Sequence, residues 1–361
     1  MTRVVTFLSH TAQPGGGELS LSRYLRATRL PVRLVTMATG AVWEDLPCPV
    51  SVAPDLVRVA AALREDDGPV VANSMRSALY AALTSPRRRP LLYWVRDGLT
   101  DSAMSQTGLR LTRHVTARRV TAYLANSGWT AATVRDALGA RAERVQVVQS
   151  LCGVPEAPEE GSPRAAPRDP LRLLYLGRLA PWKGAHVAVR AVPLLRAQGL
   201  QVTLSIAGAA HFGEDDYVGQ LAELARSTEG VTMLGHVDDV ATLLASHDLT
   251  VHCSLRPEPF GQVVVQSLPA AVPVVATQGG GPSEILRDAP VDLLHEPGDA
   301  AALAAAVQRV LADYPGASRW ALRRAADFSD ATAAARTDTV LGDHLSRSPS
   351  GPRPAARRST T

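Results

Sequence analysis

The amino-acid sequence predicts two tandem α/β domains, each built on a doubly wound parallel sheet. Both halves open with an apolar run, a glycine-bearing loop and a helical pattern, first over residues 4–30 and again over 171–195. The remaining apolar runs are nearly continuous, which is typical of parallel strands buried on both faces. Since such domains bind ligands at the carboxyl ends of their strands, the pattern predicts a ligand site in a cleft between the two domains.

The predicted strands follow one another along each half, with helical stretches between them. In the first half they are 4–8, 70–72, 91–95, 122–125 and 145–148, with helices over 18–30 and 130–138. In the second half they are 171–176, 202–206, 231–234, 249–252, 272–276 and 291–294, with helices over 184–195, from about 261, and over 300–311. Asp299 is the expected N-cap of the last of these helices.

Proline marks the boundary between the halves. Residues 154–170 are rich in proline and acidic residues and show no apolar periodicity, so they can continue neither a helix nor a central strand. We therefore predict an N-terminal domain over 1–153, a linker over 154–170 and a C-terminal domain over 171–342, whose last helix can pack back on the N-terminal domain. The basic, Pro- and Ser-rich residues 343–361 are predicted to be disordered.

Composition narrows the functional classes. The chain is 46% hydrophobic and 4% aromatic with a net charge of +4, and it has no apolar run of about 18 residues that would cross a membrane. Its amino-terminal apolar stretch is too short for a secretory signal, and its three cysteines form no C-x-x-C pair, so we expect a cytoplasmic protein. The histidine spacing matches no metal motif, so no metal and no other cofactor are expected.

Basic residues are distributed unevenly. Lys183 is the only lysine among the 38 basic residues. Residues 1–168 contain more basic than acidic residues, whereas residues 169–342 contain more acidic than basic ones. This distribution is expected if an anionic ligand binds between the domains. The arginines within 108–123 and at 87–89 form either a solvated surface, which we favour, or a peripheral membrane contact. The low aromatic content and the lack of a recognition motif argue against nucleic-acid binding.

The most informative segment is 257–268, where a strand leads through two prolines into a helix. The backbone N–H groups of Gly261, Gln262 and Val263 lack intrahelical partners at such a helix start, which attracts anionic oxygens such as those of a diphosphate. Glu258 lies just outside it, either as a ligand of sugar hydroxyls or as a plain loop residue.

Two further loops at the same predicted edge each allow two interpretations. Gly279, Gly280 and Gly281 either let a ligand approach the backbone or form an ordinary turn. Arg178 and Lys183 either bind an anion or are solvated.

Together these segments resemble a known family. Three segments of the second half resemble the nucleotide-sugar half of retaining glycosyltransferases with the GT-B fold, of the bacterial family 4 type: GRLAPWKG at 177–184, LSIAG at 204–208 and PEPFGQVVV at 257–265. In the first half, PGGGE at 14–18 and Ala125–Ser127 also resemble that family. The resemblance covers roughly residues 4–340. It implies two Rossmann-like domains facing across a cleft and metal-independent transfer of a sugar, with retention, from a nucleotide diphosphate to a hydroxyl acceptor. Natural products, glycolipids and polysaccharides remain open as acceptors.

The resemblance also implies roles for particular residues. Arg178 and Lys183 match the pair that clamps the donor diphosphate, and Glu258 matches a residue that holds donor-sugar hydroxyls, so these three are the expected catalytic residues. The further implied donor contacts are Gly16 and Gly17 in the first loop, His236 and Val237 near the nucleobase, and Phe260, Gly261, Gln262, Val263 and Gln266.

The sequence departs from the family pattern at two places. Gln266 stands where the family has a ribose-binding Glu, a change expected to cost about 1 kcal/mol of nucleoside affinity, so Gln266→Glu is predicted to tighten binding. Arg96 and Asp97 replace a histidine near the donor sugar; they either bind an acceptor, through an anionic group and a hydroxyl or amine, or form an internal ion pair. A non-catalytic nucleotide-sugar-binding partner and a relative that couples cyclitols remain alternatives.

Overall fold

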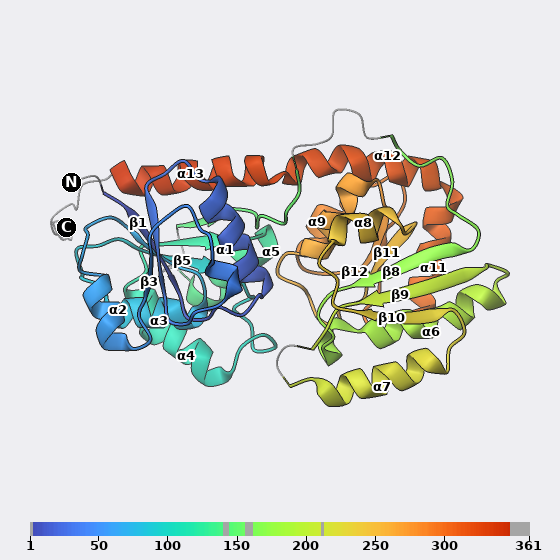
Figure 1. Cartoon of the computed structure of the whole chain (residues 1–361), viewed down its shortest axis with the longest axis horizontal. Coiled ribbons are helices and arrows are strands. Elements are labelled where there is room, and N and C mark those ends of the chain that lie inside the picture. Colours follow the sequence, from blue (N-terminus) through green and yellow to red (C-terminus); the bar gives the residue numbers. More distant parts are fainter. Residues whose placement is uncertain (1–2, 140–143, 156–161, 211–212, 347–361) are drawn as a thin grey trace, which may run out of the picture.

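A computed structural model describes residues 3–139, 144–155, 162–210 and 213–346 of this chain. It contains two parallel sheets, one of seven strands and one of six, and each sheet is flanked by helices (Figure 1). The first sheet uses residues up to Val147 and the second starts at Leu171, so the proline-rich segment lies between them.

The N-terminal sheet has the strand order β3-β2-β1-β4-β5-β6-β7, which places β1 in its middle. Its strands are β1 (Val5–Ser9), β2 (Val32–Thr36), β3 (Val50–Val52), β4 (Val70–Ala72), β5 (Leu91–Val95), β6 (Ala122–Ala125) and β7 (Val145–Val147). The helices are α1 (Gly16–Ala27), α2 (Leu56–Ala62), α3 (Met75–Thr84), α4 (Gln106–His114) and α5 (Gly128–Leu138). All residues of β1, β4, β5 and β6 are buried, which explains their continuous apolar sequences.

Two strands of this sheet, β2 and β3, were missing from the predicted set. In β2 a charged residue, Arg33, interrupts the apolar run, and its guanidinium is neutralised by Glu65 at 2.5 Å and Asp66 at 3.6 Å. The edge strand β3 has only three residues, none of them buried, so it carries no burial pattern. Both strands depend on tertiary contacts that a local pattern does not contain.

The C-terminal sheet has the order β10-β9-β8-β11-β12-β13. Its strands are β8 (Leu171–Leu176), β9 (Val202–Ala207), β10 (Val231–Gly235), β11 (Leu249–His252), β12 (Val274–Thr277) and β13 (Leu294–His295). The helices are α6 (Ala185–Ala197), α7 (Asp215–Arg226), α8 (Val240–Ala245), α9 (Gln262–Ser267), α10 (Gly281–Ile285), α11 (Ala300–Ala312) and α12 (Tyr314–Ala325). Asp299 is confirmed as the N-cap of α11, since its side chain accepts from the backbone N–H groups of Ala301 and Ala302.

The last helix, α13 (Asp330–Ser346), leaves the C-terminal domain and lies along the N-terminal domain beside α1 (Figure 1). Its residues Ala333, Ala334 and Leu341 belong to the apolar core beneath β1. Its Asp338 carboxylate accepts from Tyr24 Oη at 2.6 Å and from Thr28 Oγ1 at 2.6 Å. The N-terminal domain therefore contains a segment from the far end of the chain.

The predicted start of disorder at residue 343 is wrong, because α13 continues to Ser346. Leu341 and His344 are buried in this final turn, and the Leu345 carbonyl accepts from Arg3 Nη1 at 2.6 Å. These contacts order a stretch that the composition alone describes as polar. The remainder of the predicted tail, 347–361, and residues 156–161 of the predicted linker lie outside the described residues. Among the described helices, none is long and apolar enough to cross a membrane.

Candidate active site

The predicted donor and acceptor residues meet where β5, β8 and β11 end at the interface between the domains. Arg96 and Asp97 follow β5, Arg178 and Lys183 follow β8, and Glu258 follows β11. The positive charges of Arg178 and Lys183 act on the Asp97 carboxylate from across the interface. The structure therefore places the five residues in one electrostatic environment, at the strand ends where ligands of doubly wound domains bind.

Glu258 is the centre of a buried hydrogen-bond cluster. Its Oε2 accepts from Lys183 Nζ at 2.7 Å, from His252 Nε2 at 2.7 Å and from Ser254 Oγ at 3.0 Å. Burial alone raises the pKa of this carboxyl group, but the charges and hydrogen bonds of Lys183 and His252 outweigh burial and hold its pKa well below the usual range. The donors of the described chain converge on Oε2, so Oε1 is the oxygen left to accept from a ligand hydroxyl.

The loop that carries Glu258 is held by glycine packing. Its backbone forms an isolated parallel bridge with Gly280, and its carbonyl accepts from Gly281 N at 2.8 Å. A Cβ on Gly280 would lie 2.1 Å from the Glu258 carbonyl oxygen, and one on Gly281 would lie 2.2 Å from that of Phe260. Gly280 and Gly281 therefore serve the close approach of two backbone segments to each other, a role that neither interpretation of 279–281 included.

Three cations surround one indole ring in the same region. Lys183 ends a 3₁₀ turn over Pro181–Lys183, and its Nζ lies 4.5 Å from the centre of the Trp182 ring. The guanidinium carbons of Arg256 and Arg178 lie 4.4 Å and 5.8 Å from that ring centre. Arg178 also pairs with Glu214 at 3.9 Å. Cation–π contacts of this kind hold like charges close together, so the site favours an anionic ligand.

Arg96 is buried in the N-terminal domain. Its Nε donates to Asn73 Oδ1 at 3.0 Å, its Nη1 donates to Ser20 Oγ and Ser150 Oγ, and its guanidinium lies 3.8 Å from the centre of the Trp94 ring. Burial lowers its pKa to about 9. Its Nη2 is buried without a hydrogen-bond partner. A charged donor in that state is costly, so an acceptor atom within reach of Nη2 would lower the free energy of the site.

Asp97 differs from Arg96 because its side chain is exposed. Desolvation by the protein around it nevertheless raises its pKa, against the opposing charges of Arg256, Arg178, Arg96 and Lys183. The hydrogen bonds of the Arg96 guanidinium go to Asn73, Ser20 and Ser150, whereas Asp97 feels Arg96 as one of four positive charges that oppose the rise of its pKa. Glu18 in the first turn of α1, which the sequence reasoning missed, is a second carboxyl group nearby with a pKa raised by desolvation.

The glycine loop of the N-terminal domain touches the C-terminal domain directly. Gly16 is the first residue of α1, and its carbonyl accepts from Gln262 Nε2 at 2.8 Å. A Cβ on Gly16 would lie 3.1 Å from that amide nitrogen, and one on Gly17 would lie 3.3 Å from Arg96 Cγ. A larger residue at either position would therefore press on one of these two side chains, which would have to shift by a few tenths of an ångström.

Gln266 contacts the segment that crosses between the domains. Its Nε2 donates to the Cys152 carbonyl at 2.9 Å. The chain passes between the domains twice, near residues 152–154 and at the start of α13. The Asp330 carboxylate joins these two crossings, because it accepts from the backbone N–H groups of Cys152, Gly153 and Val154 at 2.8, 3.0 and 3.3 Å. The amide of Gln266 thus already has a partner that a glutamate would repel, which opposes the predicted gain from Gln266→Glu.

The other predicted donor residues are spread around this centre. His236 is exposed after β10 and pairs with Asp238 at 3.1 Å, and Val237 packs beside α8. Gly261, at a φ of +99°, is the N-cap of α9, and Val263 lies in the first turn of that helix. The Phe260 ring packs on the Phe328 ring, with ring centres 6.3 Å apart.

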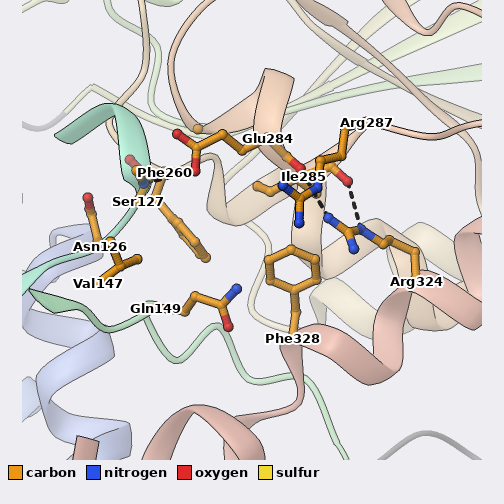
Figure 2. Close-up of a pocket in the computed structure, with 12 residues that line it drawn as sticks. Asn126, Ser127, Val147, Gln149, Phe260, Glu284, Ile285, Arg287, Arg324 and Phe328 are labelled. Carbon is orange, nitrogen blue, oxygen red and sulfur yellow. Dashed lines mark hydrogen bonds between the residues drawn. The ribbon is translucent and has the colours of Figure 1, made fainter. Parts of the chain in front are cut away.

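A cavity of about 240 Å³ is lined in part by Phe260 (Figure 2). Its walls come from both domains, with Ser127 on one side and Glu284 and Arg324 on the other. Arg324 donates to the Ile285 carbonyl at 2.9 Å and to the Glu284 carbonyl at 3.0 Å. The lining includes none of Arg178, Lys183, Glu258 or Asp97, so this cavity is separate from the charged centre.

The described residues contain no group of three or more His, Cys, Asp or Glu side chains placed to hold a metal ion. The positive charge at the site comes from side chains. His252 and Ser254 were missed as site residues by the sequence reasoning, since neither matches a spacing motif. Their position at the end of a buried strand, four to six residues before Glu258, was the available signal.

Comparisons with known proteins agree with this geometry. A model of the family described as "Glycosyl transferases group 1" matches residues 158–326, which is nearly the whole C-terminal domain. The C-terminal domain of this chain is thus similar in sequence to the group 1 glycosyltransferases. The predicted two-domain GT-B fold is confirmed by solved structures that match this chain over almost its full length.

One of these structures is HepE of Anabaena, solved with UDP and glucose, at 28% identity and a TM-score of 0.81 over 94% of this chain and 99% of that chain. Sucrose-phosphate synthase of Thermosynechococcus elongatus, at 18% identity and a TM-score of 0.73 over 94% and 98% of the two chains, shares the fold.

Curated relatives match about half of this chain. Glycogen synthase of Mycobacterium tuberculosis is 36% identical over 47% of this chain and 42% of its own length. Phosphatidyl-myo-inositol mannosyltransferase of Mycobacterium leprae is 32% identical over 52% and 51%. The chain thus spans about half the length of the curated relatives it matches.

Proposed function

We propose that this chain is a glycosyltransferase that moves a sugar from a nucleoside diphosphate donor to a hydroxyl group of an acceptor, with retention of anomeric configuration. The observation that carries the proposal is the convergence of Arg178, Lys183 and Glu258 at the domain interface. The structures of HepE with UDP and with UDP-glucose support a UDP-sugar as the donor.

In the proposed reaction, the bond between the anomeric carbon and the leaving phosphate oxygen breaks, and a bond to the acceptor oxygen forms on the same face. The acceptor proton passes to the leaving phosphate. Lys183 and Arg178 offset the negative charge that develops on that phosphate. Glu258 fixes the sugar by accepting a hydroxyl hydrogen on Oε1, while its Oε2 stays bound to Lys183 and His252.

On the opposite side of the interface, Arg96 and Asp97 are proposed to bind the acceptor. Asp97 is exposed and faces the cations of the C-terminal domain, so it can orient an acceptor hydroxyl or amine next to the donor. The unpartnered Nη2 of Arg96 suits an anionic acceptor group.

The proposal includes independence from metal ions, because two side-chain cations supply charge where the diphosphate binds. A cytoplasmic location is also proposed, which the three cysteines without a disulfide support.

The direct test incubates the full chain with a panel of nucleotide sugars that includes UDP-glucose, with and without EDTA, and measures nucleoside diphosphate release. Turnover of at least one donor in EDTA, with a product of retained configuration by NMR, is the expected result. If donors bind by calorimetry but none is turned over, the proposal fails and the chain is a nucleotide-sugar-binding partner. A metal requirement would contradict the assigned roles of Arg178 and Lys183.

A further inference from the structure

A set of polar contacts crosses the domain interface at the first turn of α5. The Glu284 carboxylate of the C-terminal domain accepts from the backbone N–H of Gly128 at 2.9 Å and from that of Trp129. The carbonyl of Pro259 accepts from Ser127 Oγ at 2.6 Å and from Thr130 Oγ1 at 3.2 Å. Figure 2 shows the Glu284 carboxylate turned toward this end of α5.

The physical chemistry of these contacts favours one relative position of the domains. The first N–H groups of an 11-residue helix such as α5 have no partners within the helix, and its N-terminus carries partial positive charge. A carboxylate that accepts two of these N–H groups satisfies them through charge-assisted hydrogen bonds. The acceptor belongs to the other domain, so the contact exists only while the domains lie together as described.

The Glu284 side is itself held in place. Arg324 on α12 donates to the carbonyls of Glu284 and Ile285 and pairs with Asp327 at 2.6 Å. These contacts fix the short helix α10 from behind, so the carboxylate projects from an anchored backbone. An anchored acceptor loses little conformational entropy when it meets α5.

The same contacts reach the loop that carries Glu258. Pro259, whose carbonyl accepts from Ser127 and Thr130, directly follows Glu258. On its other side this loop is bonded to Gly280 and Gly281, next to Glu284. The loop is therefore held between α5 of one domain and α10 of its own domain.

We propose that Glu284 and the first turn of α5 form an interdomain latch, and that Glu284 is a positioning residue that couples the closed arrangement of the domains to the placement of the Glu258 loop. The consequence for catalysis rests on the proposed function. The latch itself does not, since it is defined by contacts between the domains.

The test compares Glu284→Ala and Glu284→Gln with the wild type and with Asp288→Asn. Glu284→Ala removes both acceptor oxygens, whereas Glu284→Gln keeps one. Asp288→Asn makes the same change of charge at an exposed position just after α10 and is the matched control. The melting temperature of each variant checks that it folds. Hydrogen exchange of the amides at 128–130, small-angle scattering, UDP affinity and donor turnover are then measured.

We expect Glu284→Ala to speed exchange at 128–130 and to increase the radius of gyration. Turnover should fall by about tenfold, the scale of one charge-assisted hydrogen bond, while UDP affinity changes by less than about threefold. Glu284→Gln should lie between Glu284→Ala and the wild type, and Asp288→Asn should match the wild type.

Unchanged exchange and scattering in Glu284→Ala would overturn the latch. A loss of UDP affinity as large as the loss of turnover would also overturn it, because Glu284 would then belong to the nucleotide site. If the wild type turned over no donor, the proposed function would fail, yet exchange and scattering would still confirm or refute the latch.

Discussion

Replacement of Lys183 tests the proposed donor site most directly, because its ammonium group serves two anions. In the described structure Nζ lies 2.7 Å from Glu258 Oε2, and the two side chains are 18% and 13% exposed. At this distance and an effective dielectric constant near 20, the attraction between two unit charges is about 6 kcal/mol, before the desolvation of both groups offsets much of it. The second anion is the proposed donor diphosphate.

Lys183→Arg keeps the charge but changes its shape. A guanidinium spreads its charge over a plane and cannot place one nitrogen at the Nζ position between Trp182 and Glu258. The loss of one charge-assisted hydrogen bond, about 1.5 to 3 kcal/mol, lowers kcat/KM by roughly 10- to 150-fold. Lys183→Met removes the charge toward both anions, so its loss is expected to be larger than that of Lys183→Arg.

The assay measures kcat and KM for donor turnover, together with the melting temperature. Arg190→Lys, which exchanges the same two residue types at an exposed position of α6, is the control and should behave as wild type. Activity of Lys183→Arg within twofold of wild type would refute the argument from shape. Equal losses in Lys183→Arg and Lys183→Met would show that charge at this position has no role.

Three other outcomes follow from contacts near the interface. Gln266→Glu is expected to lower the free energy of unfolding by about 1 to 3 kcal/mol, because a carboxylate would face the Cys152 carbonyl. Its UDP affinity should rise by no more than about twofold, and a tenfold gain measured by calorimetry would contradict this. Asp330→Asn, which weakens the hydrogen bonds to three backbone N–H groups, should lower the free energy of unfolding in urea by a similar amount. An unchanged urea midpoint would show that these hydrogen bonds do not stabilise the two crossings between the domains. Because the pKa of Glu258 is depressed in the folded protein, its ionised form stabilises the fold in full above the ordinary pKa of about 4.3, and this stabilisation is lost as the pH falls below that value. The difference in unfolding free energy between wild type and Glu258→Gln should therefore shrink between pH 6 and pH 3. A difference that stays constant with pH would refute this argument.

Much of the fold was predictable from the sequence because buried parallel strands leave continuous apolar runs. Strands β4, β5, β6, β8 and β11 have the predicted bounds. Strand β2 was not found because Arg33 breaks the run, and only its tertiary partners Glu65 and Asp66 make burial of that position possible. The end of α13 was also missed, because its order comes from packing on a domain that is distant in sequence.

Residues of the candidate site were predictable only where they lie in a segment that resembles the family. Lys183 and Glu258 were found through the segments that resemble the family, and the structure joins them by a direct ion pair. The partners that tune Glu258, His252 and Ser254, follow no spacing rule and become visible only when the strand end is folded against the loop. Phe260 lies in the same motif, yet its ring is used in packing on Phe328.

The return of α13 to the N-terminal domain has a consequence for synthesis on the ribosome. Tyr24 and the core beneath β1 receive their last partners, Ala333, Ala334, Leu341 and Asp338, only after the whole C-terminal domain has been translated. Until then, apolar surface of the first domain stays uncovered, although its seven strands are already available. The first domain to be synthesised is therefore the last to be completed, and truncation before residue 330 is expected to damage the amino-terminal half of the chain first.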